Sequence, residues 1–240
     1  MSLNCIVVNQ GNTSTKWGVF EEGKLTITHR TFDSEEETKV IQLLEKNDLP
    51  FFGISVCDLA RQENLFQRLP LFTRVNREIM PNHRYTQGVP GEDRLVNLAG
   101  AALLYPGEQF LVIDFGTCIT YTIGTASSLL GGAISPGVSS RLKAMHEYTG
   151  NLPLVSFSHP DMTFGNSTEA AMLAGVYFGI LGEIKLFIDQ ARGEYPHSQV
   201  VFTGSDAAYF AERLEYRIFA EEKLTLFGIY ALAQRLNLSL

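Results

Sequence analysis

The chain has 240 residues, of which 45% are hydrophobic and 19% are charged. This composition is typical of a globular protein and excludes a disordered tail protein, a collagen and a coiled-coil rod. The formal net charge is −7 and no basic run is present, so we expect neither nucleic acid nor an anionic membrane as a partner. We find no apolar stretch of roughly 18 residues, and we therefore expect no segment to span a bilayer.

The three cysteines, Cys5, Cys57 and Cys118, lie in apolar runs. They form neither a CxxC pair nor a cluster with histidines. This pattern favours reduced, buried thiols in a cytoplasmic protein over a disulfide framework or a zinc site.

A pattern near the N-terminus is repeated in the second half of the chain. A run of apolar β-formers leads into Asn9–Thr13, and a similar run leads into Asp114–Thr117. In both places an Asp or Asn, one residue and a glycine precede hydroxyl-bearing side chains, and a second apolar run follows. Each copy predicts strand, tight turn, strand. The repetition predicts two similar domains, residues 1–107 and 108–240.

The remaining segments alternate between strand and helix patterns. In the first half we expect a strand at 24–30, a helix starting with the capping pattern at 34–37, a strand at 52–57, a helix at 59–69, an irregular stretch at 81–90 and a helix at 93–104. In the second half we expect a strand at 129–134, a helix from the turn at 135–137 to about 148, a long helix at 167–190, a strand at 200–204 and a helix at 222–237. This alternation indicates an α/β fold. Since no linker separates the halves, we expect a cleft between them.

The two repeated turns suit an anion. A glycine in a hairpin turn lets backbone N–H groups approach a phosphate closely, hydroxyl side chains add donors, and Lys16 adds a positive charge. Either turn alone is better explained as a plain hairpin. The repetition favours a phosphate clamp. Asp114, at the end of an apolar strand, suits a cation, and the alternative is that it only caps its turn.

A second candidate is the glycine-rich stretch Gly88–Arg94, which places an acid and a base at the mouth of a helix. The alternative is that Asp93 is a helix-capping acid and Arg94 a solvated side chain. The glycines of Gly131–Gly137 and Thr203–Ser205 permit close backbone approach, as ligand walls or as tight connections. His146 is a possible substrate contact.

In their order along the chain, these motifs resemble those of the type III pantothenate kinases. The family's D-x-G-N-T turn with a following Lys matches residues 9–16, its G-x-D-R matches 91–94, its D-x-G-T matches 114–117, its G-G-x-I-x-P-G matches 131–137 and its N-x-T matches 166–168. The run 224–228 resembles its closing motif. The resemblance covers nearly the whole chain, and the ordered set is far more specific than any single motif.

The resemblance implies the superfamily of sugar kinases and actin, with two ribonuclease H-like domains and mixed sheets. It implies ATP-dependent phosphorylation of pantothenate to 4'-phosphopantothenate, the first step of coenzyme A biosynthesis, in a cytoplasmic homodimer. Asp93 resembles the proton acceptor and Asp114 the ligand of a monovalent cation, K+ or NH4+, with Mg2+ accompanying ATP. The expected ATP contacts are Asn9, Gln10, Gly11, Asn12, Thr13, Ser14, Thr15, Lys16 and Thr117. The expected substrate contacts are Tyr85, Gly91, Glu92, Asp93, Arg94, His146 and Thr168.

The chain departs from the family pattern at three positions. Asn9 replaces an Asp that helps to hold magnesium, so it keeps an acceptor oxygen and loses a negative charge, which lowers the expected metal affinity. Tyr85 lies one residue closer to Gly91 than the pattern has it. Ser205 replaces the last glycine of the family's T-G-G.

Two rival hypotheses follow. Asn9 motivates a degenerate relative that binds nucleotide or pantothenate with little turnover, and the superfamily also includes other phosphotransferases and phosphate hydrolases. We predict the working pantothenate kinase, because the residues expected on the acceptor side, Asp93 among them, are intact.

Overall fold

The computed structural model describes residues 2–237, which form two compact units. Within the described residues, the first unit comprises 2–110, 122–131 and 223–237, and the second comprises 111–121 and 132–222. Each unit is therefore assembled from separate stretches of the chain. The predicted domain division at residues 107 and 108 stays a prediction, because it concerns the two repeated modules rather than these units.

The first unit contains a mixed sheet with the strand order β3-β2-β1-β4-β5. Strands β1, β2 and β3 pair antiparallel, whereas β4 pairs parallel with both β1 and β5. The central strand β1 is buried along its whole length, so both faces of the sheet must be covered. The bounds are β1 Cys5–Gln10, β2 Thr15–Glu21, β3 Lys24–Thr31, β4 Phe51–Ser55 and β5 Phe72–Arg74.

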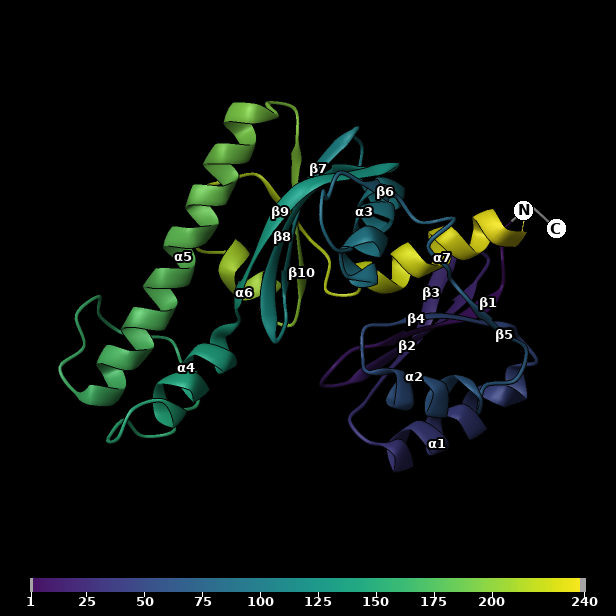
Figure 1. Cartoon of the computed structure of the whole chain (residues 1–240), viewed down its shortest axis with the longest axis horizontal. Helices are drawn as coiled ribbons and strands as arrows, with labels where there is room; N and C mark the ends of the chain where they lie inside the picture. The colour runs from purple at the N-terminus through teal and green to yellow at the C-terminus, as the bar shows by residue number, and fades with distance from the viewer. Residues whose placement is uncertain (1, 238–240) are drawn as a thin grey trace. The chain divides into compact units, whose positions relative to one another are not determined.

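Helices α1 (Ser34–Leu44) and α2 (Leu59–Phe66) cover one face of this sheet (Figure 1). Ile6 and Val8 alternate along β1 toward that face and pack against Ile41 of α1 and Leu65 of α2. The strand period of two and the apolar stripe of each helix thus meet in one core.

The opposite face of the sheet is covered by α7 (Leu224–Asn237), which contacts β1, β2 and β4 (Figure 1). Phe20 stacks on Tyr230 of this helix, with 4.1 Å between the ring centroids. Helix α3 (Glu92–Leu104) packs against α7 and contacts β4. A Cβ added to Gly228 would collide with the carbonyl oxygen of Val96, so the two helices approach closely there.

A second mixed sheet has the order β11-β10-β7-β8-β9-β6. Five of its strands repeat the order of the first sheet: β9, β8, β7, β10 and β11 correspond to β3, β2, β1, β4 and β5. Strands β10 and β11 pair parallel, as β4 and β5 do. The repeated turns therefore join equivalent strands, and the predicted α/β fold with mixed sheets is confirmed. The bounds are β6 Asn82–His83, β7 Gln109–Phe115, β8 Cys118–Thr125, β9 Ser128–Pro136, β10 Gln199–Gly204 and β11 Ile218–Ala220.

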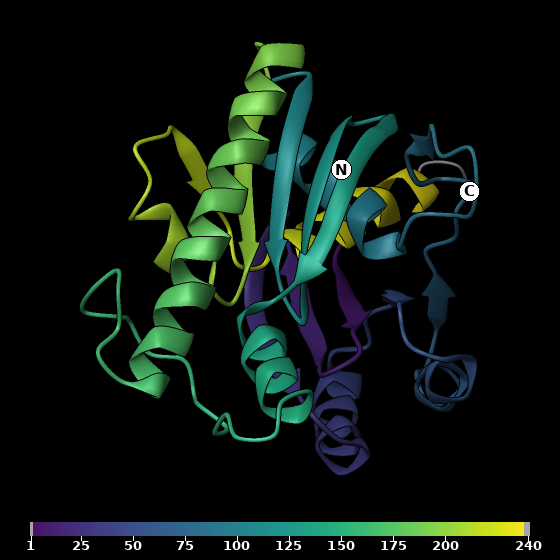
Figure 2. The ribbon, with the colours of Figure 1, turned by 60° about the vertical axis from the view of Figure 1, so that its left-hand side comes forward.

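The second unit carries helices α4 (Val138–Glu147), α5 (Thr168–Glu194) and α6 (Ala207–Ala211). Figure 2 shows α5 running along the strands of the second sheet. By length and composition alone, α5 is long and apolar enough to cross a membrane. This differs from our expectation that the chain holds no such segment. The core helix of a globular protein meets the same criterion, and Ile180, Ile184 and Ile188 of α5 are fully buried at a spacing of four residues.

The long elements lie where the sequence predicts them, with shifted ends. Asp33, not Ser34, caps α1, and its carboxylate accepts from the backbone N–H groups of Glu35 and Glu36 at 2.9 Å. Helix α2 ends at Phe66, three residues early. The three cysteines are free, as predicted, but only Cys5 is buried: Cys57 is half-buried and Cys118 is exposed. The elements absent from the prediction are β5, β6, α6, β11 and the 3-10 turn Glu45–Asn47.

Candidate active site

The predicted site residues are divided between the two units. The first unit holds Asn9–Lys16, Tyr85 and Gly91–Arg94, and the second holds Asp114, Thr117, His146 and Thr168.

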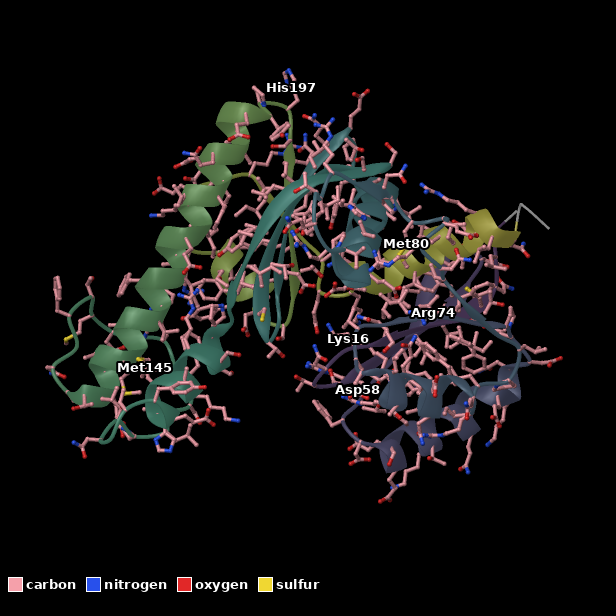
Figure 3. The ribbon with its side chains drawn as sticks, viewed as in Figure 1. Lys16, Asp58, Arg74, Met80, Met145 and His197 are labelled. Atoms are coloured by element: carbon pink, nitrogen blue, oxygen red, sulfur yellow. The ribbon has the colours of Figure 1, made fainter. Side chains whose placement is uncertain are left out.

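The first repeated turn connects β1 to β2 and is closed by a hydrogen bond from the Gly11 N–H to the Ser14 carbonyl at 3.0 Å. Asn12 and Thr13 are exposed at its tip. Figure 3 labels Lys16 on β2 and Asp58 at the start of α2, the elements that flank the turn. A glycine turn with exposed backbone beside a lysine is a suitable place for an anion.

Three side chains of this turn are held by the rest of the unit. The Gln10 amide is fully buried, accepts from Ser55 Oγ at 2.9 Å and donates to the Arg61 carbonyl at 3.2 Å. Ser14 Oγ accepts from Arg30 Nε at 3.0 Å. The Thr15 hydroxyl donates to a Glu37 carboxylate oxygen at 2.7 Å. The sequence predicts ligand contacts for Gln10, Ser14 and Thr15, and their side chains brace the turn from inside.

Asn9 differs from these neighbours. Its side chain is 9% exposed, and its Oδ1 atom has no hydrogen-bond partner among the described residues. A buried acceptor without a partner is costly, so its presence points to a ligand that the atom receives. An amide oxygen suits Mg2+ or a water molecule of its hydration shell. The residue therefore fits a magnesium role, with one negative charge less than an aspartate.

At the start of α3, Gly91 is the N-cap and Asp93 lies in the first turn. Asp93 is partly buried, and its Oδ1 accepts from the Arg94 N–H at 2.9 Å. Burial raises the pKa of the Asp93 carboxyl group above its ordinary value, against the lowering effect of that hydrogen bond and of the Arg94 charge. A carboxylate whose affinity for a proton is raised is better suited to general-base chemistry than an exposed one.

Arg94 is buried, so its reading as a solvated side chain is wrong. Its Nε donates to Thr122 Oγ1 at 2.9 Å and its Nη1 donates to the Tyr85 hydroxyl at 2.5 Å. Tyr85 is thus brought to the arginine despite its shifted spacing in the sequence. A buried, oriented guanidinium matches a carboxylate ligand.

Glu92 is also buried, and its carboxylate pairs with Arg74 at 3.2 Å and with Arg77 at 3.8 Å. Arg77 also donates to the Pro90 carbonyl at 2.8 Å. Glu92 therefore fixes the glycine-rich loop that leads into α3.

In the second unit, Asp114 lies partly exposed near the end of β7. Gly204, with φ at +92°, approaches it so closely that an added Cβ would lie 2.8 Å from an Asp114 carboxylate oxygen and would collide with the Phe115 carbonyl. A carboxylate beside backbone carbonyls is a donor set that suits a hard cation. Among the described residues there is no cluster of three or more His, Cys, Asp or Glu side chains.

The second repeated turn is closed by the Gly116 N–H and the Cys118 carbonyl at 3.0 Å. The Thr117 carbonyl accepts from the Gly137 N–H at 2.9 Å and from Ser140 Oγ at 2.7 Å. Gly137 admits no Cβ, because one would collide with the Gly116 carbonyl. The predicted close backbone approach at Gly137 is therefore present.

The other two predicted contacts of the second unit are exposed side chains. His146 Nδ1 lies 2.7 Å from the Leu152 carbonyl and so anchors the loop after α4. Thr168 is the first residue of α5, and Ser167 is its N-cap, accepting from the Ala170 N–H at 3.2 Å.

Two basic residues at the first turn, Arg30 and Arg61, were not predicted from the sequence. Arg30 arrives because β3 pairs with β2, and Arg61 arrives on α2 and donates to the Asn12 carbonyl at 2.6 Å. No local motif marks either residue, because only the packing of the sheet and α2 brings them to the turn.

A family model and curated relatives of this chain carry the same family description. The family model described as type III pantothenate kinase matches residues 5–190. The chain is 38% identical over 229 residues to the type III pantothenate kinase of Flavobacterium johnsoniae, covering 92% of this chain and 93% of the relative. It is 32% identical over 233 residues to that of Christiangramia forsetii, covering 93% and 95%.

Solved structures share the fold at low sequence identity. A Campylobacter jejuni protein assigned to the Baf family of transcriptional activators matches with a TM-score of 0.65 and 21% identity, covering 98% of this chain and 100% of that one. A protein of Sinorhizobium meliloti described as a 2-dehydro-3-deoxygalactonokinase matches with a TM-score of 0.60 and 13% identity, covering 97% and 99%.

Proposed function

The chain belongs to the type III pantothenate kinase family and phosphorylates pantothenate with ATP in coenzyme A biosynthesis, and we propose that Asp93 accepts the proton of the pantothenate hydroxyl. The partly buried carboxyl group at the start of α3, with its raised pKa, is the observation that carries this proposal. As the new O–P bond forms, the hydroxyl proton passes to Asp93 and the terminal phosphoryl group leaves ADP. No observation favours the degenerate relative.

Arg94 and Tyr85 are proposed to bind the carboxylate of pantothenate. The guanidinium is buried and is oriented by Thr122 and by the Tyr85 hydroxyl. A carboxylate gains more from such a prepared, charged donor than from a flexible surface arginine, because less side-chain entropy is lost on binding. Gly91, Glu92, His146 and Thr168 complete the proposed substrate contacts.

The turn Asn9–Lys16 is proposed to contact the phosphates of ATP, together with Thr117. Lys16, Arg30 and Arg61 supply three positive charges in and around this turn. Phosphoryl transfer depends mainly on positioning and on neutralising phosphate charge. The arrangement fits this requirement.

Two cations are part of the proposal. Asn9 Oδ1 would receive Mg2+ or its hydration water, and Asp114 would hold K+ or NH4+. Bound there, the cations would neutralise phosphate charge. Asn9 contributes an oriented acceptor, and Asp114 contributes the negative charge.

A cytoplasmic homodimer is also proposed. Large apolar side chains of the second unit are exposed, among them Phe164 at 89% and Leu186 at 55%. Large exposed apolar surface on a soluble protein often marks an interaction site. A second copy of the chain would cover them, and Thr168 lies at the start of the same helix as Leu186. The three free cysteines fit the reducing cytoplasm.

A coupled assay with ATP, pantothenate, Mg2+ and K+ tests the proposed phosphate turn. We expect Lys16→Met to raise the KM for ATP roughly tenfold or more, because a charge-assisted contact to phosphate is lost, and to leave the KM for pantothenate near that of the wild type. Lys24→Met, at the exposed start of β3, is the matched control. Equal KM values for ATP in Lys16→Met and the control would show that the turn does not bind the phosphates.

A further inference from the structure

We propose that Cys57, in the connection from β4 to α2, and Arg61, in the first turn of α2, are positioning residues that set the orientation of the peptide groups in the ATP-binding turn. This inference rests on the proposed function, since it requires that the turn contacts phosphate. Neither residue touches the reacting atoms, and both act through the turn.

Three groups from residues 56–61 donate hydrogen bonds to three successive carbonyl groups of the turn. The Gln10 carbonyl accepts from the Val56 N–H at 3.0 Å. The Gly11 carbonyl accepts from the Cys57 thiol at 3.0 Å. The Asn12 carbonyl accepts from Arg61 Nη1 at 2.6 Å. A single short segment thus fixes every peptide plane from Gln10 to Asn12.

Fixing the carbonyls also fixes the N–H groups. A trans peptide is planar and its C=O and N–H bonds point in opposite directions, and the described residues contain no cis peptide. With the Gly11 carbonyl directed at the Cys57 thiol, the Asn12 N–H is directed away from Cys57. An anion approaching that side meets a donor and not a carbonyl oxygen, which would repel it.

The turn and the start of α2 each donate a side-chain hydrogen bond to a backbone carbonyl of the other. The Gln10 side chain donates to the Arg61 backbone carbonyl at 3.2 Å, while the Arg61 side chain donates to the Asn12 carbonyl. Ser55 Oγ donates to the same Gln10 amide, and Cys57 N–H donates to Ser55 Oγ at 3.2 Å. The turn is therefore ordered before ATP arrives, and binding costs less conformational entropy. The Arg61 charge also adds to the local positive potential.

If these contacts only stabilised the fold, removing one would lower the melting temperature without a specific change in the KM for ATP. The chain offers a control variant that separates the two cases. Arg68 lies just beyond α2 and donates to the Ser34 carbonyl at 3.4 Å and to Thr38 Oγ1 at 2.9 Å. It ties α2 to α1 and pairs with Glu37 at 3.7 Å. Among the described residues it makes no hydrogen bond to the Gln10, Gly11 or Asn12 carbonyl groups. Arg61→Met and Arg68→Met each remove one arginine that bonds to a backbone carbonyl, and only the first loosens the turn.

The test measures the KM for ATP, the KM for pantothenate and the melting temperature of both variants. We expect Arg61→Met to raise the KM for ATP roughly tenfold, the equivalent of one charge-assisted hydrogen bond, and to change the KM for pantothenate less than twofold. Arg68→Met should lower the melting temperature with both KM values unchanged. Arg61→Lys should recover part of the affinity for ATP. An unchanged KM for ATP in Arg61→Met, or an equal rise in both KM values, would overturn the inference.

Cys57 gives a second measurement that holds even if Arg61→Met fails to fold. Cys57→Ser keeps a donor to the Gly11 carbonyl and should stay close to the wild type, whereas Cys57→Ala should raise the KM for ATP roughly threefold, as expected for one neutral hydrogen bond. Identical KM values for ATP in the two variants would contradict the inference. If Lys16→Met raises this KM and the Arg61 and Cys57 variants do not, only the inference fails. If Lys16→Met is also silent, the proposed phosphate turn fails.

Discussion

The carboxyl group of Asp93 is held at the start of α3 in a partly buried position, and burial is the main cause of its raised pKa. A raised pKa means that the folded protein binds this proton more tightly than the unfolded chain does. Protonation therefore stabilises the fold at low pH, and this stabilisation is lost as the pH rises through the folded pKa. At neutral pH the ionised group favours catalysis at the expense of stability.

Asp93→Asn should accordingly abolish turnover while leaving the melting temperature at pH 7 unchanged or higher. Activity of the wild type should fall on acidification, beginning at a higher pH than an ordinary aspartate would give, because the proton acceptor must be ionised. Turnover by the coupled assay and thermal unfolding at pH 5 and pH 7 check both statements. Full turnover in Asp93→Asn would remove this residue as the base.

Asn9 is the clearest departure from the family pattern. Its Oδ1 has no hydrogen-bond partner in residues 2–237, and this makes its proposed role testable. Asn9→Asp should lower the Mg2+ concentration for half-maximal turnover severalfold, because a carboxylate attracts the cation more strongly. Without metal the same variant should lose about 1–3 kcal/mol of stability, because it buries an unpaired charge. Titration of turnover with Mg2+ and thermal unfolding with and without Mg2+ give the two readouts. Identical metal dependence in both proteins would place Asn9 outside the magnesium site.

For single residues, the sequence predicts which side chains belong to the site better than it predicts which residues they contact. Asp93, Arg94 and the glycine turn are recognisable from local motifs, and the structure brings Tyr85 to Arg94. Arg61 could not be found in this way, because its contact with Asn12 spans 49 positions and depends on how α2 packs. The burial of Arg94 could not be predicted either, because its partner Thr122 lies on β8, 28 positions along the chain.

The crossing of α3 and α7 shows how an element far from the turn positions the site. Gly228 of α7 lies against the Val96 backbone of α3, and Thr225 donates to Asn97 at 2.8 Å within the same contact. Because Asp93 lies one turn before Val96, a displacement of α3 here is transmitted to the proposed base.

Gly228→Ala should therefore destabilise the protein by about 1–3 kcal/mol, because the added methyl group overpacks a helix crossing, and it should lower turnover as well. Gly193→Ala, in a helix but with nothing near an added Cβ, is the matched control and should leave stability unchanged or raise it by up to about 1 kcal/mol. Denaturant unfolding of both variants decides the matter. Equal stabilities would show that the crossing accommodates a side chain.

The sequence predicts long elements and misses short ones for a physical reason. Helices α3 and α5 show apolar periodicity over several turns, and the strand at Lys24–Thr31 is long enough to alternate. Strands β5 and β11 have three residues each, which is too short for a period of two to stand out. Their position comes from pairing with β4 and β10, which is a tertiary constraint.

Across the whole molecule, the exposed apolar side chains bear on the assembly state. Leu186→Glu, on the long helix of the second unit, should convert a dimer into a monomer, because a charge cannot be buried unpaired in an apolar interface. Leu43→Glu is the matched control, since Leu43 is exposed on α1 of the first unit. Sedimentation velocity measures both variants. A wild-type monomer at micromolar concentration would refute the homodimer.

The repeated turns predicted two similar domains, and the two sheets have matching strand orders around those turns. The division at residues 107 and 108 stays a prediction. The interleaving of the two compact units was not predictable from such a repeat, because it depends on where α7 packs. Nothing in the residues 224–237 themselves indicates that their helix covers the sheet formed by the first strands of the chain.

That interleaving has a consequence for synthesis on the ribosome. The strands of the first sheet emerge early, yet α7, which shields Phe20 and its neighbours, is translated after the whole of the second unit. Until then one apolar face of the nascent sheet is open to water and to other chains, and its closure awaits the final helix. A polypeptide truncated before α7 would keep this exposure permanently and would be a natural substrate for chaperones and proteases.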